Sequence, residues 1–178
     1  MSDMTKDKIA DTLEELLERQ SLDKITIKLL VTECGISRQS FYYYYKDILD
    51  VLEWIAHRKL EKLLHQSLNV TNYKSGIYMF IDFAFENHYF ITRLLDSKHR
   101  KFIEQLIVSS LRSFLENILR ILRQRKEPLS FNYFDIDAIL DFCTYGLAGL
   151  LLEASKNKNT DKEVLARQMH DLLLKVLT

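Results

Sequence analysis

The chain has 178 residues, with 25 basic and 25 acidic residues and therefore no formal net charge. It contains only four Gly and one Pro, while 47% of its residues are hydrophobic. So few turn-forming residues argue against a sheet protein, and the apolar content excludes a disordered or collagen-like chain. We therefore expect an all-α protein of about nine helices.

Apolar residues at helical spacing predict these helices in chain order. The expected ranges are 5–19, 27–34, 38–45, a helix from a cap at Asp47 to about residue 68, then 76–86, 88–95, 98–126, 134–157 and 161–177. Thr26 and Ser37 are expected to cap the second and third helices, and Gly35 to end the second. The polar break at 69–75 is the expected hinge. We predict an N-terminal DNA-binding domain over 1–50, and an effector-binding and dimerisation domain over 51–178.

Residues 26–45 have the layout of a helix-turn-helix, with two short helices joined by a tight turn at Gly35. On the second of these helices Phe41 and Tyr45, together with Ile36, are expected to point inward. The opposite face then carries a guanidinium, an amide and two phenols, from Arg38, Gln39, Tyr42 and Tyr43. Such groups suit the base edges of a major groove. Alternatively, some of the four consecutive tyrosines simply pack the domain.

The stretch from Thr26 to Asp47 resembles the helix-turn-helix signature of TetR-family regulators. The shared pattern is a Thr that opens a helix, a small residue and Gly, an aliphatic residue, Ser, and then Ser-Phe-Tyr. The resemblance implies base or near-base contacts from Lys28, Arg38, Gln39 and Tyr43. It implies phosphate contacts from Thr26, Ser37, Ser40, Tyr42 and Tyr44.

The start of the fourth helix adds a predicted anion site, formed by backbone amides with Lys46 beside them. Two positions depart from the family pattern. Tyr44-Tyr45 stands where the family has His-Phe, and Ile48 stands where it has Lys, which removes one phosphate contact. The alternative to a DNA-binding regulator is therefore a dimeric helical adaptor that has kept the motif but lost DNA binding.

The C-terminal half resembles that of a Gram-positive TetR subgroup, the dihydroxyacetone kinase regulators. Aromatic residues at helical spacing are candidates for an effector cavity, although such residues more often pack a core: Phe80, Phe83, Phe90, Phe102, Phe114, Phe142 and Tyr145. In the family, the last two helices of each subunit form a four-helix bundle across a two-fold axis. The dimer interface is accordingly predicted at Gly146, Gly149, Leu165, Met169, Leu172, Leu173 and Val176, unless these faces are covered within one subunit.

Enzyme signatures are absent from the sequence, which has no Gly-rich phosphate loop, HExxH or Cys-x-x-Cys. We expect no enzyme activity, cofactor or metal. Cys34 and Cys143 fit free thiols in a reducing bacterial cytoplasm, and no apolar run approaches the length of a membrane span. The prediction is a homodimeric transcriptional regulator that binds double-stranded DNA at a pseudo-palindrome and responds to a small molecule or partner protein.

The zero net charge hides a division along the chain. Residues 1–50 hold 7 basic and 10 acidic side chains, which leaves the predicted DNA-binding domain at −3. Most of the acids lie on the first helix, whereas Lys24, Lys28, Arg38 and Lys46 gather around the predicted DNA face. We therefore expect weak non-specific DNA binding and a specificity that depends on few contacts.

Overall fold

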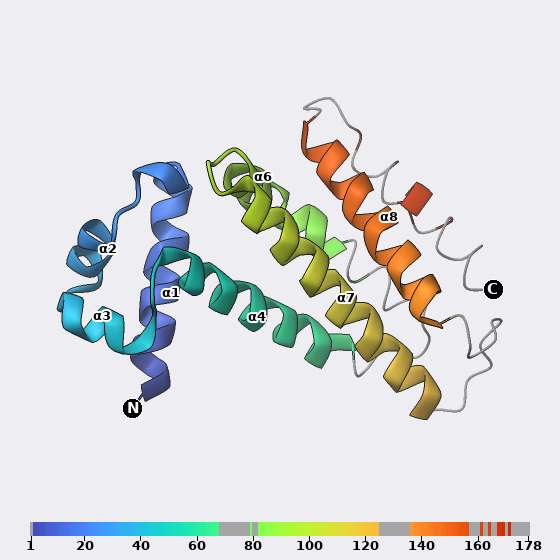
Figure 1. Ribbon diagram of the computed structural model, residues 1–178, viewed down its shortest axis with the longest axis horizontal. Helices are drawn as coiled ribbons and strands as arrows, with labels where there is room; N and C mark the ends of the chain where they lie inside the picture. The colour runs from blue at the N-terminus through green and yellow to red at the C-terminus, as the bar shows by residue number, and fades with distance from the viewer. Residues whose placement is uncertain are drawn as a thin grey trace.

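A computed structural model describes residues 2–67, 82–124 and 136–156, together with residues 79, 161, 164, 167–169 and 171. All regular elements in this part of the chain are helical, which confirms the all-α prediction. Three N-terminal helices gather at one end of an elongated molecule and a long helix pair lies at the other (Figure 1). A single helix, α4, runs between the two groups.

The elements are α1 (Ser2–Arg19), a 3-10 turn η1 (Leu22–Lys24), α2 (Ile27–Cys34), α3 (Arg38–Tyr44), α4 (Ile48–Ser67), α6 (His88–Leu95), α7 (Arg100–Gln124) and α8 (Ile136–Lys156). The predicted bounds of α2 and α6 agree with the structure, and the other described helices differ by at most three residues. Residues 79 and 82–86 of the predicted helix over 76–86 are helical, as are residues 164, 167–169 and 171 of the predicted helix over 161–177. Residue 161 is not helical. The other residues of these two predicted helices, and the predicted hinge, lie outside the described residues.

Local side-chain chemistry explains where the N-terminal helices begin and end. The hydroxyl oxygens of Thr26 and Ser37 accept hydrogen bonds from backbone amides three residues ahead, at 3.2 and 3.0 Å. Gly35 has a φ of +67°, the left-handed conformation that ends α2 and that other residues adopt only with strain. These caps fix the length of the turn between α2 and α3.

The first hydrophobic core lies among α1, α2, α3 and the N-terminal half of α4, where Leu52 and Ile55 are buried. Leu94 and Leu95 of α6 and Ile103 of α7 belong to the same core. The N-terminal helices therefore do not close a core by themselves. Their packing continues directly into the C-terminal half of the chain.

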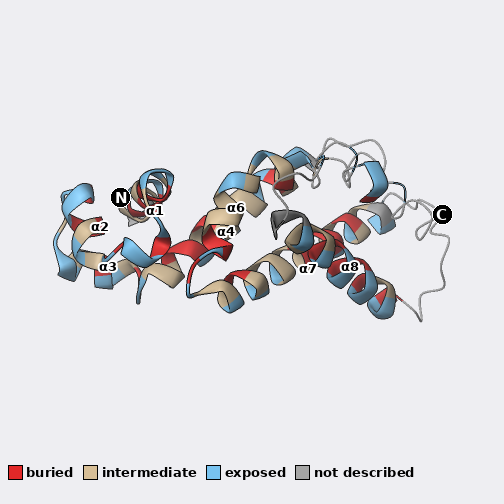
Figure 2. Ribbon diagram, turned by 90° about the horizontal axis from the view of Figure 1, so that it is seen from above, coloured by how far each residue is buried: buried red, intermediate tan, exposed pale blue. Residues whose placement is uncertain are grey.

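The second core lies between α7 and α8, which run side by side (Figures 1 and 2). Phe114 of α7 and Leu147 of α8 are buried there, and so is Leu63 near the end of α4. Since α4 contributes to both cores, the predicted boundary at residue 50 falls in the first turn of a helix that the two halves share. The division into two domains stays a prediction.

Charged groups join α1 to α4 at the surface of the first core. Arg58 lies 2.7 Å from carboxylate oxygens of both Asp11 and Glu14, and 3.4 Å from Asp7. Lys59 lies 2.7 Å from the other oxygen of Glu14. Burial alone would lower the pKa of Arg58, but the neighbouring carboxylates outweigh it and raise that pKa. We call these five residues the α1–α4 charge cluster.

Two further contacts join the N-terminal helices to the region around α6. The Arg93 guanidinium donates a hydrogen bond to the backbone oxygen of Glu18 at 2.7 Å. The backbone amide of Lys98 donates to the carboxylate of Asp23 at 3.2 Å. The N-terminal helices are therefore tied to the rest of the chain at α4, α6 and the start of α7.

No helix in the described part of the chain is both long and apolar enough to cross a membrane.

Two aromatic residues on α3 provide a test of this packing. Phe41 is fully buried, so Phe41→Ala is expected to lower the free energy of unfolding by about 3–5 kcal/mol. Tyr43→Ala, at an exposed position of the same helix, is the matched control and should change it by less than about 0.5 kcal/mol. Urea denaturation followed by circular dichroism measures both values. Equal losses in the two variants would contradict the assigned orientation of α3.

Candidate nucleic-acid interface

The outer face of α3 carries the residues that the sequence predicted there. Arg38 and Gln39 are exposed at the start of the helix, and Tyr42 and Tyr43 are 58% and 79% exposed. Phe41 is buried on the opposite face, together with Tyr45 just beyond the helix. The helix therefore presents a guanidinium, an amide and two phenols to solvent along one side.

Tyr45 is an anchor within the molecule. Its hydroxyl donates a hydrogen bond to the backbone oxygen of Lys6 at 3.1 Å, and the Lys6 ammonium lies over its ring. Burial, with a further contribution from Asp7, raises the pKa of the Tyr45 phenol. Tyr45 thus ties the end of α3 to α1 and is not available to a ligand.

Tyr44 is neither fully buried like Tyr45 nor exposed like Tyr43. Its ring is half-buried against the first core and meets the edge of Tyr43, with 4.9 Å between ring centroids. Ile48 packs against the same core, so its side chain is part of the hydrophobic packing. The tyrosine run is therefore divided between packing and exposure, as the sequence analysis left open.

The remaining predicted DNA-binding residues surround α3. Thr26, Lys28, Ser37 and Lys46 are exposed, and Ser40 is half-buried. The Thr26 and Ser37 hydroxyls accept capping hydrogen bonds through oxygen. Each hydroxyl proton can therefore still be donated to a phosphate oxygen. The capping hydrogen bonds that shape the motif therefore leave the two hydroxyls able to contact DNA phosphates.

The start of α4 has the predicted cap at Asp47, and carboxylates already occupy part of the predicted anion site. The backbone amide of Lys46 donates to the Asp50 carboxylate at 2.8 Å, and the amide of Asp50 donates to Asp47 at 3.0 Å. Two of the amides that could hold a phosphate are thus already paired with carboxylates, because both acids lie within one turn of the helix start. The exposed Lys46 side chain remains as the cationic group there.

Part of the acidic charge of the N-terminal region is paired inside the molecule. Asp7, Asp11 and Glu14 face the cations of the α1–α4 charge cluster, and Asp23 accepts the Lys98 amide. The sum of −3 therefore overstates the negative potential that DNA would meet at α3.

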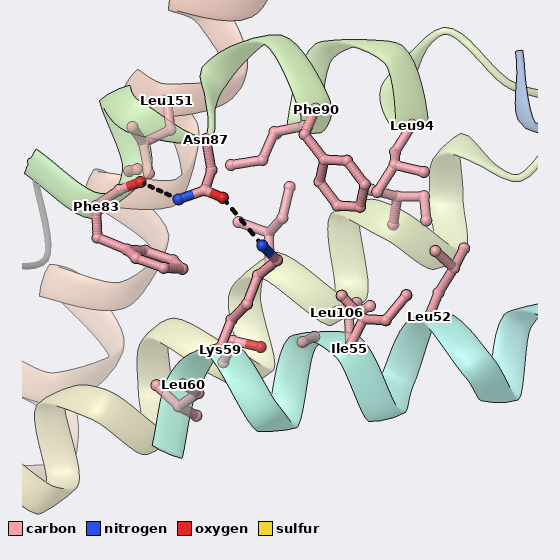
Figure 3. Close-up of a pocket in the computed structure, with 16 residues that line it drawn as sticks. Leu52, Ile55, Lys59, Leu60, Phe83, Asn87, Phe90, Leu94, Leu106 and Leu151 are labelled. Atoms are coloured by element: carbon pink, nitrogen blue, oxygen red, sulfur yellow. Dashed lines mark hydrogen bonds between the residues drawn. The ribbon is translucent and has the colours of Figure 1, made fainter. Parts of the chain in front are cut away.

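A second site is an apolar cavity of about 110 Å³ between α4, α6 and α7 (Figure 3). Phe83 and Phe90, both predicted as effector contacts, line it. Two polar residues that sequence reasoning missed, Lys59 and Asn87, also line the cavity, and Lys59 reaches from α4 toward Asn87. Helical spacing alone gave no signal for them, since a lysine on an amphipathic helix normally faces water.

The other predicted cavity residues lie elsewhere. Phe114 is buried in the second core, and Phe102 packs against the first. Phe142 and Tyr145 are 67% and 65% exposed on α8, which corrects their assignment to a cavity. The physical reason is that aromatic spacing identifies a helix face without saying which neighbour covers it. Phe80 lies outside the described residues.

Some of the residues predicted for the dimer interface are exposed on the surface, and one is buried. Gly146 and Gly149 are exposed on α8, and a Cβ atom added at either would meet no atom within 4 Å. Met169, in contrast, is fully buried in the second core of its own subunit, so its assignment to the interface is corrected. The remaining predicted interface residues, Leu165, Leu172, Leu173 and Val176, lie outside the described residues.

Both cysteines are free and buried, and burial raises the pKa of each thiol. A raised pKa disfavours the reactive thiolate, so both thiols act as packing residues in their cores. Among the residues that the structure describes, no group of three or more His, Cys, Asp or Glu side chains is arranged to hold a metal ion.

No protein-family model matches the chain. The HTH-type dhaKLM operon transcriptional activator DhaS of Lactococcus lactis subsp. lactis (strain IL1403) is 21% identical, over 96% of this chain and 89% of that protein. A solved structure of the dihydroxyacetone kinase operon activator DhaS has a TM-score of 0.74 at 17% identity, covering 97% of this chain and 96% of the other. A TetR-family transcriptional regulator from Pectobacterium atrosepticum has a TM-score of 0.63 at 15% identity, covering 99% and 93%.

In its helix-turn-helix, its all-helical fold and a sequence likeness that spans nearly the whole chain, the protein resembles DhaS and solved TetR-family transcriptional regulators. The likeness to DhaS is found in both sequence and structure. The proteins it resembles are named as regulators of transcription and not as enzymes.

Tyr45 gives a pH-dependent test of the geometry at the end of α3. Burial raises its pKa in the folded state, so above about pH 10 the unfolded chain loses this proton first and stability falls. Tyr45→Phe removes that contribution, and it should lose less stability than the wild type between about pH 9 and about pH 11. Denaturation curves across this range measure the difference. Tyr43→Phe is the control, and an identical pH dependence in Tyr45→Phe and wild type would refute the buried phenol.

Proposed function

We propose that the chain is a homodimeric regulator that inserts α3 of each subunit into successive major grooves of a pseudo-palindromic operator. The observation that carries this proposal is the exposed face of Arg38, Gln39, Tyr42 and Tyr43 on a helix whose other face is buried. Residues 1–50 would form the DNA-binding domain and residues 51–178 the effector-binding and dimerisation domain.

Direct readout in this proposal comes from the ends of the exposed side chains. Arg38 can bond a guanine with two donors, Gln39 can pair with an adenine, and the aromatic rings can pack against thymine methyl groups. Lys28 would make a base or near-base contact. Lys46 and the hydroxyls of Thr26, Ser37 and Ser40 would contact phosphates and set the position of α3. Tyr42 and Tyr44 are the remaining proposed phosphate contacts.

An exposed stripe on α8 supports the homodimer. Ala138, Phe142, Tyr145, Gly146 and Gly149 are all exposed and recur at helical spacing along one side of the helix. Two large aromatic rings beside two glycines allow a second helix to approach closely while its side chains cover the rings. The same stripe on a second subunit can supply such a helix across a two-fold axis. A second subunit also supplies the second operator half-site.

Selection of bound sequences from random double-stranded DNA tests the function directly. We expect enrichment of a pseudo-palindrome whose half-sites are separated by about one helical turn. Binding to the enriched site should weaken steeply with salt concentration. A helical adaptor that has lost DNA binding would enrich no sequence and give no shift at low salt, and that result would refute the proposal.

Arg38→Ala tests the assigned base contact. The variant is expected to lose about 1–3 kcal/mol of discrimination between the enriched site and a site changed at the guanine. Lys46→Ala, at a proposed phosphate contact, is the comparison and should weaken binding to both sites similarly while reducing the salt dependence. Fluorescence anisotropy titrations measure each affinity. Undiminished discrimination in Arg38→Ala would show that another residue reads the base.

Phe142→Arg tests the proposed dimer surface. A charge at this exposed position should shift the protein from dimer to monomer in sedimentation equilibrium while leaving its helical content unchanged. Gln105→Arg, at an exposed position on α7, is the control and should remain dimeric. If Phe142→Arg stays as dimeric as the control, the interface lies elsewhere.

A further inference from the structure

We propose that Tyr43 contacts the methyl group of a thymine in each operator half-site, and that Tyr44 is a positioning residue whose ring holds the Tyr43 ring in place for this contact. Both roles rest on the proposed insertion of α3 into a major groove. They are supported by the exposure of Tyr43, by the contact that orients its ring, and by its position on the helix beside Gln39.

Tyr43 is the most exposed apolar ring on the proposed DNA-binding face. It is 79% exposed, more than any other large hydrophobic residue that the structure describes. Tyrosine offers a binding partner a large apolar surface at a low cost in conformational entropy, because only two side-chain angles have to be fixed. The Tyr43 ring is therefore free to pack against a group on DNA.

The orientation of this ring is set by the next residue in the chain. The rings of Tyr43 and Tyr44 meet edge to face, with 4.9 Å between their centroids and 86° between their planes. Aromatic pairs prefer this geometry. Consecutive side chains on a helix do not normally face each other, so the two rings have turned toward one another. Because Tyr44 is half-buried against the first core, the supporting ring is itself anchored.

Tyr42, the other exposed tyrosine of α3, is less suited to this contact. It is 58% exposed, and its ring meets the buried ring of Phe41 edge to face, with 5.4 Å between centroids. Tyr42 therefore shows less of its ring to a partner than Tyr43 does. Tyr43 has the larger apolar surface and a supporting ring that lies outside the fully buried core.

Tyr43 also lies on the same side of α3 as Gln39, which is exposed. Residues four positions apart are neighbours on a helix surface, with about 5–6 Å between their Cβ atoms. Base pairs follow one another about every 3.4 Å along DNA. The thymine contacted by Tyr43 would therefore lie about one or two base pairs from the base that Gln39 contacts.

Thymine is the base whose major-groove edge suits an aromatic ring. It presents a C5-methyl group there, which gives an apolar ring a group to cover. Removing one methyl group from water favours the complex by about fourfold. Unlike a phosphate contact, such a contact releases no counterions and adds nothing to the salt dependence of binding.

The experiment replaces single thymines of the selected operator by deoxyuridine, in both half-sites at once, and measures the affinity of the full chain by fluorescence anisotropy. Uracil keeps the hydrogen-bonding groups of thymine and lacks only the methyl group. At the position that Tyr43 contacts, we expect binding to weaken about tenfold or more, because one methyl contact is lost in each half-site.

Variants of Tyr43 assign this methyl effect to its ring. Tyr43→Ala should bind the thymine and uracil operators equally well, whereas Tyr43→Phe keeps the ring and should keep the preference for thymine. Tyr89→Ala is the matched control, because it removes an exposed tyrosine from α6, and it should also keep the preference.

Variants of Tyr44 test the positioning role. Tyr44→Leu keeps an apolar side chain against the first core but removes the supporting ring, and it should reduce the preference for thymine to less than about threefold. Tyr44→Phe restores the ring and should restore the full preference. The ratio of the two affinities is informative here, since a lost phosphate contact or a less stable fold weakens binding to both operators alike. Circular dichroism establishes that each variant is folded, and Tyr44→Met is the second variant.

Separate outcomes overturn the separate claims. An enriched half-site without thymine, or a methyl effect that persists in Tyr43→Ala, overturns the role of Tyr43. A full preference for thymine in folded Tyr44→Leu or Tyr44→Met overturns the role of Tyr44. Each of these results leaves the proposed DNA-binding function standing, because a pseudo-palindrome has been enriched. If the random selection enriches no sequence, the proposed function fails, and the thymine contact fails with it.

Discussion

The junction between α1 and α4 is the constraint on which the rest of the structure depends. α4 supplies Leu52 and Ile55 to the N-terminal core and Leu63 to the core between α7 and α8. Apolar burial provides the stability here, because partly exposed ion pairs such as those of Arg58 are each worth less than about 1 kcal/mol. The charges instead set the position of α1 on α4, since Glu14 is bound by two adjacent cations of one helix.

This arrangement connects the proposed DNA-binding face to the cavity over a short path. α3 is held by Phe41 in the first core and by the hydrogen bond from Tyr45 to α1. α1 is held in turn by α4, and the Lys59 side chain on α4 lines the cavity. A displacement of α1 relative to α4 would therefore carry α3 with it, which is the kind of rigid-body movement that a dimeric reader of two half-sites can use.

Local chemistry made the helix-turn-helix predictable. Thr26, Gly35 and Ser37 act within three or four residues of themselves, so their capping roles require no knowledge of distant parts of the chain. The pairing of the Lys46 amide with Asp50 was not predictable in the same way, although Asp47 was expected to cap α4. Asp47 and Asp50 satisfy the amides there in competition with a phosphate, and the choice among acceptors depends on side-chain geometry. Phe142, Tyr145 and Met169 were misassigned for a related reason: an apolar face does not identify its partner.

The sequence by itself determined the helical class, the helix ends around Gly35 and the exposed chemistry of α3, because periodicity and capping are local properties of the chain. Only the tertiary structure decided that α4 belongs to two cores, that Phe83 and Phe90 line a cavity while Phe142 and Tyr145 face solvent, and that Lys59 lies between Glu14 and Asn87. The two contacts of Lys59 alone join residues 45 and 28 positions apart, and only the packing of whole helices brings such residues together.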